Sequence, residues 1–152
     1  MMIRNAKPED APSLVDLARS LGQPQDDAAF AQDISSYSEG FFVAEADDRL
    51  SGYLIMRPQP KPGCVQAFSP IQLWRLFVSA EYQGKGVATS LISRAIAYAR
   101  AKQNDVVWLG TSADNARAIA FYRKSGFRPV GTAVLHHGHG AHDDLIMCRG
   151  TE

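Results

Sequence analysis

A turn with two glycines, in QGKG (residues 83–86), separates two strongly patterned segments of the chain. Residues 71–79, IQLWRLFVS, are apolar on both faces apart from Gln72 and Arg75, which predicts a central strand covered on both sides. Apolar residues in 87–102 recur at helical spacing and form a wide stripe. The chain must therefore fold so that a buried strand ends in a glycine turn and the turn opens a helix.

A junction of this kind, where a strand leads through a glycine turn into a helix, favours the binding of an anion. Several backbone N–H groups meet at the start of the helix, and the helix dipole adds partial positive charge there. Gly84 and Gly86 allow positive φ or a close approach to a ligand, and Lys85 adds charge at the rim. Position 89 is Thr89, where a dinucleotide fingerprint needs glycine, and the residue order is wrong for a nucleoside-triphosphate loop. On these residues alone, a turn without a ligand is an equally good interpretation.

The remaining patterns predict an α/β sandwich with a mixed sheet. Strand patterns occupy residues 2–5, two segments within 40–57 joined by a turn at Asp47-Asp48, 71–79, 106–112, 128–137 and 143–149. Helical patterns occupy residues 8–22, 26–37, 87–102 and 115–127. Residues 58–70 contain four prolines and predict a long loop. No repeat or linker interrupts the chain, so we expect one domain, 1–152.

Composition excludes several functional classes. The chain has 152 residues, 45% of them hydrophobic, and a formal net charge of zero, which is typical of a soluble globular protein. A net charge of zero gives no excess of basic residues that would predict binding to nucleic acid or to an anionic membrane. No apolar run approaches the ~20 residues that are needed to cross a bilayer. The N-terminus lacks a signal-like apolar core, and two cysteines are too few for a disulfide scaffold. We therefore expect a cytoplasmic protein without nucleic-acid or membrane partners.

The histidines invite a metal-site interpretation, because all four lie in the segment HHGHGAHDD, at His136, His137, His139 and His142. Imidazoles and carboxylates suit zinc or nickel. Two glycines in this short segment, however, give no defined ligand geometry. We expect a solvated loop between the last two strands and no metal, with His136 or His137 facing the substrate as the alternative.

Two motifs resemble the signatures of the GNAT superfamily of N-acetyltransferases. Residues 83–88, QGKGVA, match Gln/Arg-x-x-Gly-x-Gly/Ala, the loop that binds the diphosphate of acyl-CoA in that family. Residues 112–131, SADNARAIAFYRKSGFRPVG, match Asn-x-x-Ala-x-x-Phe-Tyr-x-x-x-Gly-Phe at every marked position. One glycine motif is weak evidence, whereas two at the right separation are strong, and the likeness covers nearly the whole chain.

A narrower resemblance is to bacterial polyamine acetyltransferases of the PaiA type. It rests on the segments FFVAEADDRLSGYLIM, RLFVSAEYQGKG, WLGTSADNARAIAFYRKSGF and DLIM. Those relatives usually carry Glu-Leu-x-Arg-Ile-Tyr-Val on the fourth strand, where this chain has Gln72 at the Glu position and Phe77 at the Tyr position. This likeness therefore leaves the acceptor open.

The resemblance implies a mixed, mostly antiparallel central sheet flanked by helices, in which strands 71–79 and 106–112 splay apart to hold acetyl-CoA. It assigns the diphosphate to Gln83, Gly84, Lys85, Gly86, Val87, Ala88 and Thr89. It assigns the pantetheine arm to Leu76, Phe77 and Val78, and a hydrogen bond to that arm to Asn115, which is also a good helix N-cap. A backbone N–H of the strand would bind the thioester oxygen, a role worth ~3 kcal/mol.

Tyr122 is the candidate general acid, because a phenol with a pKa near ~10 is protonated at neutral pH and can match a departing thiolate. Without the motif, an ordinary half-buried helix tyrosine would be the better interpretation. The general base stays open among Asp143, Asp144, Glu39 and a water chain. Gln72 cannot accept a proton, and Glu81 is close to the predicted phosphate turn.

The sequence therefore predicts an acetyl-CoA-dependent N-acetyltransferase that acts on a primary amine of a small molecule or polyamine by direct transfer in a ternary complex. Gln72, where a carboxylate is common, favours the alternative of an acyl-CoA-binding module without catalysis. Protein N-terminal acetylation uses the same core and is a further alternative. The oligomeric state, including a homodimer, and the pathway are left open.

Overall fold

The computed structural model describes residues 1–137 and 140–152 and confirms the predicted order of elements. The strands are β1 (Met2–Asn5), β2 (Phe41–Ala46), β3 (Arg49–Arg57), β4 (Pro70–Val78), β5 (Val106–Ser112), β6 (Arg128–His137) and β7 (Gly140–Gly150). The α-helices are α1 (Ala11–Ser20), α2 (Asp27–Ser36), α3 (Val87–Ala101) and α4 (Ala116–Lys124), with 3-10 turns η1 (Pro8–Asp10) and η2 (Ala80–Tyr82).

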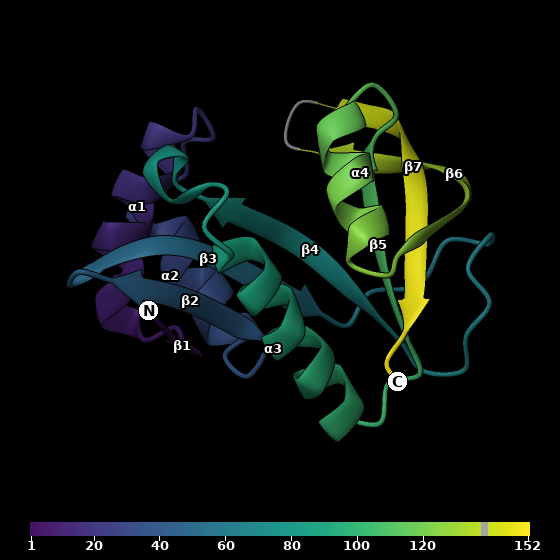
Figure 1. The fold of residues 1–152 in the computed structure, drawn as a ribbon, viewed down its shortest axis with the longest axis horizontal. Coiled ribbons are helices and arrows are strands. Elements are labelled where there is room, and N and C mark those ends of the chain that lie inside the picture. The colour runs from purple at the N-terminus through teal and green to yellow at the C-terminus, as the bar shows by residue number, and fades with distance from the viewer. Residues whose placement is uncertain (138–139) are drawn as a thin grey trace. The chain divides into compact units, whose positions relative to one another are not determined.

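The described strands form one mixed sheet with the order β1-β2-β3-β4-β5-β7-β6 (Figure 1). β4 and β5 pair in parallel, whereas β1–β2, β2–β3, β5–β7 and β6–β7 pair antiparallel. Helices flank the sheet, so the predicted fold class is confirmed. The chain divides into two compact units: unit 1 is Met1–Arg57 with Arg75–Ala95, and unit 2 is Pro58–Trp74 with Ile96–Glu152.

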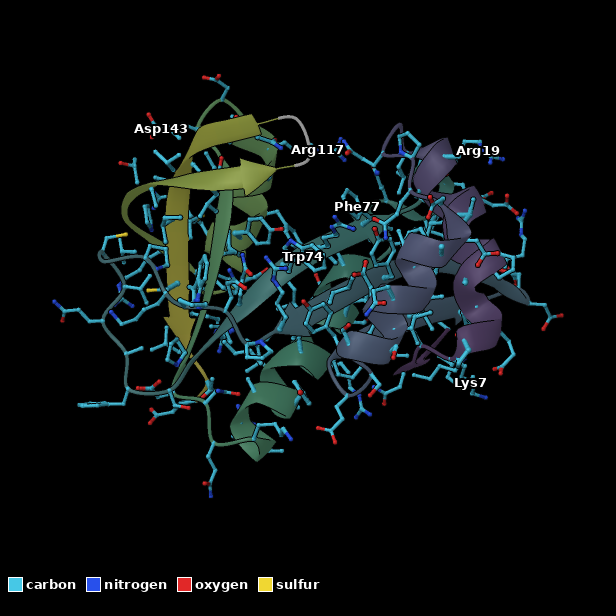
Figure 2. The ribbon with its side chains drawn as sticks, turned by 180° about the vertical axis from the view of Figure 1, so that it is seen from behind. Lys7, Arg19, Trp74, Phe77, Arg117 and Asp143 are labelled. Carbon is cyan, nitrogen blue, oxygen red and sulfur yellow. The ribbon has the colours of Figure 1, made fainter. Side chains whose placement is uncertain are left out.

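Unit 1 is organised around a buried tyrosine. The Tyr53 ring on β3 is 2% exposed and contacts Phe30 of α2, Phe41 of β2 and Phe77 of β4, with centroid distances of 5.7, 5.7 and 5.4 Å. Aromatic pairs at such distances stabilise a core by more than the burial of their apolar area alone would. The cluster therefore fixes α2 and the end of β4 to the sheet of unit 1, and Phe77 is visible on β4 in Figure 2.

Helix α1 begins later than its acidic residues suggest, because Asp10 bonds to β1. Its carboxylate accepts hydrogen bonds from the Arg4 guanidinium at 2.8 and 2.9 Å and from the Lys7 N–H at 2.7 Å. The bidentate pair holds the pKa of Asp10 below its ordinary value. The helix stops before Gly22, as predicted, since the chain there takes φ 70°.

Unit 2 has its own core between the sheet and the proline-rich loop. Trp108, Ile146 and Cys148 are buried together with Val65 of the loop. The Asp105 carboxylate holds the loop end, because it accepts from the N–H groups of Phe68 and Ser69, both at 2.8 Å. The C-terminal end of helix α4 is tied to β7 by a hydrogen bond from Arg149 to the Ser125 carbonyl at 2.8 Å, and Figure 1 shows the helix drawn in front of β5.

The expectation that the strand 71–79 is covered on both faces is correct only for its beginning. Residues 71–73 are buried, whereas residues 74–78 are half-exposed. β4 and β5 are in register from Pro70↔Val106 to Gln72↔Trp108. Full burial is thus confined to the beginning of the strand, close to its pairing with β5, and an apolar sequence alone does not reveal where that burial ends.

The predicted loop between the last two strands is shorter than expected. β6 reaches His137 and β7 begins at Gly140, with His136 opposite Ala141. Antiparallel pairing to β6 thus overrides the low strand propensity of glycine in this segment. His139 and the side chains of residues 136–142 lie outside the described part of the chain, so the histidine segment stays a prediction.

Candidate active site

The glycine turn of the sequence lies where β4 leads into α3. After Val78 the chain forms η2, passes through Gln83–Gly86 and enters the helix at Val87. Gly84 has φ 77° and Gly86 has φ 85°, both in the left-handed region. A side chain in this region costs roughly 1–2 kcal/mol, so the path of the turn requires glycine at both positions.

Amide groups at the start of α3 are available for an anion. The Gly86 carbonyl accepts from the Ser90 N–H at 3.0 Å, which closes the first helical turn. The amides of residues 87–89 precede that donor and therefore have no helical carbonyl to bond. A Cβ built on Gly84 or Gly86 would meet no atom within 4 Å, so the space beside the turn is open. Open space, free amides and the helix dipole fit a diphosphate.

The structure gives Gln83 a role that the motif does not specify. Its side-chain amide donates to the Val78 carbonyl at 3.1 Å and closes the turn onto the end of β4. Its backbone N–H donates to the Ala80 carbonyl at 3.3 Å. Gln83 therefore shapes the turn, and Lys85 and Thr89 are exposed beside it.

The predicted pantetheine segment, Leu76–Val78, is the half-exposed end of β4. The Phe77 carbonyl faces β3, because a Cβ built on Gly52 would lie 2.7 Å from it, and the Ser79 N–H donates to the Ser51 carbonyl at 2.8 Å. Main-chain groups alternate sides along a strand. The N–H groups of Leu76 and Val78 therefore point away from β3, and these are the amides of the segment that can bind a ligand.

Sequence reasoning missed a set of contacts between this turn and the β2–β3 hairpin. The Tyr82 hydroxyl donates to the Asp47 carboxylate at 2.9 Å, and Arg49 lies 3.4 Å from Glu81. Asp47 and Tyr82 are 35 positions apart. No local pattern joins such residues, so only the folded structure reveals the pairing.

Asn115 and Tyr122 belong to unit 2, whereas the predicted residues of the glycine turn and of β4 belong to unit 1. Asn115 caps α4 as expected, since its side-chain oxygen accepts from the Ala118 N–H at 3.1 Å. Tyr122 is half-buried, and the centroid of its ring lies 5.6 Å from that of Phe121 and 5.8 Å from that of Phe127. Burial raises the pKa of Tyr122 to about 12, so its phenol is protonated at physiological pH.

The candidate bases differ in burial. Asp143 on β7, labelled in Figure 2, and Glu39 are exposed, whereas Asp144 is 3% exposed. A Cβ built on Gly110 would lie 3.0 Å from the Asp144 carboxylate, which places that carboxylate beside β5. Gln72, which cannot accept a proton, is 6% exposed and in register with Trp108. Burial thus distinguishes Asp144 from the other two carboxylates.

Among the residues that the structure describes, no group of three or more His, Cys, Asp or Glu side chains could hold a metal ion. No helix in the same part of the chain is both long and apolar enough to span a membrane.

Comparison with known proteins identifies related sequences and folds. Residues 9–127 match the model of the acetyltransferase (GNAT) family. An uncharacterized N-acetyltransferase of Mycobacterium bovis is 29% identical over 143 residues, which cover 93% of this chain and 83% of the relative.

Two solved structures share the fold. The ribosomal-protein-alanine N-acetyltransferase from Brucella melitensis superposes with a TM-score of 0.80 and 23% identity over 99% of both chains. The PaiA N-acetyltransferase from Thermoplasma acidophilum, solved with coenzyme A, gives a TM-score of 0.73 and 20% identity over 98% of both chains. At these identities the likeness establishes the fold.

Replacing Gly86 tests the turn directly. We expect Gly86→Val to weaken binding of acetyl-CoA, the ligand that the motif implies, by at least about tenfold, because a β-branched residue cannot hold φ 85° without strain and would move the amides. The free energy of unfolding should fall by only about 1–2 kcal/mol. Equilibrium titration and denaturant unfolding measure the two effects.

Gly63→Ala is the matched control, because a Cβ there also meets no atom within 4 Å and the backbone is not in the left-handed region. We expect it to leave both quantities unchanged. Destabilised Gly86→Val protein that binds acetyl-CoA with wild-type affinity would mean that the turn is only structural.

Proposed function

The chain belongs to the GNAT family of acetyltransferases and is an N-acetyltransferase, and from this premise we propose that it transfers the acetyl group of acetyl-CoA to a primary amine of a small molecule or polyamine. The observation that carries the proposal is the pair of left-handed glycines at the start of α3, with φ of 77° and 85°. We further propose that residues 1–152 act as a single catalytic domain in the cytoplasm, where reducing conditions suit the free thiols of Cys64 and Cys148.

The proposed binding residues divide by the part of acetyl-CoA that they hold. The amides of residues 84–88 and the Lys85 ammonium hold the diphosphate, while Gln83 keeps the turn closed. The main chain of Leu76 and Val78 holds the pantetheine arm, together with the Asn115 side chain. When bound, acetyl-CoA supplies an acetyl group activated as a thioester. An N–H of Leu76 or Val78 donates to the thioester oxygen and stabilises the negative charge that develops there.

Tyr122 is the proposed proton donor to the departing sulfur. Because its pKa of about 12 lies above that of an ordinary thiol, near ~8.5, complete transfer of its proton to a free thiolate is uphill. Its hydroxyl therefore acts first as a hydrogen-bond donor that stabilises negative charge on sulfur. When its proton is transferred as the sulfur leaves, the phenolate regains a proton from the group that accepted the amine's proton, so the step ends with a free thiol and a protonated Tyr122. The proton lost by the amine needs a separate acceptor, for which Asp144 is the buried carboxylate among the candidates.

The activity is tested by mixing the protein with acetyl-CoA and a panel of amines and following release of free thiol. The panel contains polyamines, amino acids, simple primary amines and short peptides with a free N-terminus. We expect at least one primary amine to accelerate thiol release, while its tertiary N-methylated analogue does not. Binding of acetyl-CoA without acceleration by any acceptor would instead indicate a module that binds acyl-CoA without catalysis.

Tyr122→Phe keeps the ring and removes only the hydroxyl. If the hydroxyl protonates the leaving thiolate, kcat should fall by ~10²-fold, the usual scale for a positioned acid. A hydroxyl that only orients the sulfur should cost about tenfold. Stability and the Kd for acetyl-CoA should stay close to wild type. The measurement is kcat at saturating acetyl-CoA, with an amine that the wild type accepts.

Tyr98→Phe is the matched control, since Tyr98 is also half-buried in unit 2 but lies on α3. It should retain wild-type kcat. Wild-type turnover in Tyr122→Phe would remove Tyr122 from the mechanism, and a large drop in Tm with little kinetic change would make its hydroxyl structural.

A further inference from the structure

We propose that the β2–β3 hairpin braces the glycine turn of α3, with Tyr82 and Asp47 as positioning residues for the diphosphate of acetyl-CoA. The inference rests on the proposed function and adds residues that lie outside the acyl-CoA motif. All the residues concerned belong to unit 1.

The turn needs support because its own backbone is unusually free. Glycine loses more conformational entropy on ordering than any other residue, and the turn contains Gly84 and Gly86. Amides that bind an anion must be held in place before the ligand arrives, or the ordering cost is subtracted from its affinity. Contacts that fix the turn in the free protein therefore act on ligand binding.

Three contacts from the β2–β3 hairpin reach the segment that leads into the turn. The Ser51 carbonyl accepts from the Ser79 N–H at 2.8 Å, Arg49 lies 3.4 Å from Glu81, and the Asp47 carboxylate accepts from the Tyr82 hydroxyl at 2.9 Å. The three contacted residues follow one another along the chain between the end of β4 and the glycines. The Tyr82 contact lies nearest to the glycines and so controls the turn most directly.

The tip of the hairpin is itself well fixed. Asp47 has φ 53° and Asp48 has φ 62°, so both central residues of the turn are left-handed, as in the tight hairpin turns that match strand twist. Aspartate tolerates this conformation better than most residues. A two-residue turn, closed by the pairing of Ala46 with Arg49, thus presents the Asp47 carboxylate at a defined position.

Tyr82, which bonds to the hairpin through Asp47, also contacts the positive charge of Lys85. The Lys85 ammonium lies 5.7 Å from the centroid of the Tyr82 ring, within the range of a cation–π contact. The hydrogen bond to Asp47 raises the pKa of the Tyr82 phenol, so the hydroxyl is protonated and can donate at physiological pH. One side chain therefore orients both the backbone of the turn and the cation at its rim.

The test compares two ligands that differ in the diphosphate. Equilibrium titration gives the Kd of acetyl-CoA and of S-acetylpantetheine, which lacks phosphate, for the wild type, Tyr82→Phe, Asp47→Gly and the double variant. Glycine suits the left-handed backbone at residue 47, so Asp47→Gly removes the acceptor without straining the turn. Asp48→Gly is the matched control.

We expect Tyr82→Phe and Asp47→Gly each to raise the Kd of acetyl-CoA roughly 3- to 10-fold, the modest effect of one exposed hydrogen bond. The double variant should be no weaker than the worse single variant, because both changes remove the same bond. S-acetylpantetheine affinity and the Asp48→Gly control should not change.

Unchanged acetyl-CoA affinity in both single variants would overturn the brace. An equal loss for S-acetylpantetheine would overturn it too, because the hairpin would then support the unit as a whole. Failure of the wild type to bind acetyl-CoA is a separate result, seen before any variant is made, and it would overturn the proposed function.

Discussion

The candidate site depends on one backbone constraint, which is the left-handed conformation of Gly84 and Gly86, with φ of 77° and 85°. Each would cost roughly 1–2 kcal/mol for a residue with a side chain. Because the chain takes this path, α3 begins at Val87 and its first amides open into free space. The proposed anion site is therefore built from the backbone, and the hydrogen bonds of the Gln83 and Tyr82 side chains are proposed to hold that backbone in place.

Each unit supports its proposed site residues on a separate core. In unit 1 the aromatic cluster around Tyr53 includes Phe77, so the segment proposed to hold pantetheine is packed at its centre and half-exposed at its edge. In unit 2 the core around Trp108 is formed partly by β5 and β7, while Tyr122 lies on α4 and Asn115 caps that helix. Rigid elements with locked neighbours position reactive groups more accurately than loops do.

The sequence predicted most of the fold and the parts of the site that depend on local pattern. The order of elements, the Gly22 stop, the Asn115 cap and the glycine turn all follow from periodicity and backbone chemistry, which act over a few residues. What it missed depends on long-range pairing. The Tyr82–Asp47 bond spans 35 positions. Burial along β4 and the early start of β7 likewise depend on neighbouring strands, which a single sequence does not display.

The assignment of the glycine turn to the diphosphate is tested most directly by identifying the backbone amides that coenzyme A contacts. In protein labelled with ¹⁵N, the amide signals of Gly84, Gly86 and residues 87–88 should show the largest saturable shifts when coenzyme A is added. Pantetheine, which has no diphosphate, should leave those signals in place. Saturable binding of coenzyme A that shifts other amides and leaves these unmoved would contradict the assignment of the glycine turn to the diphosphate.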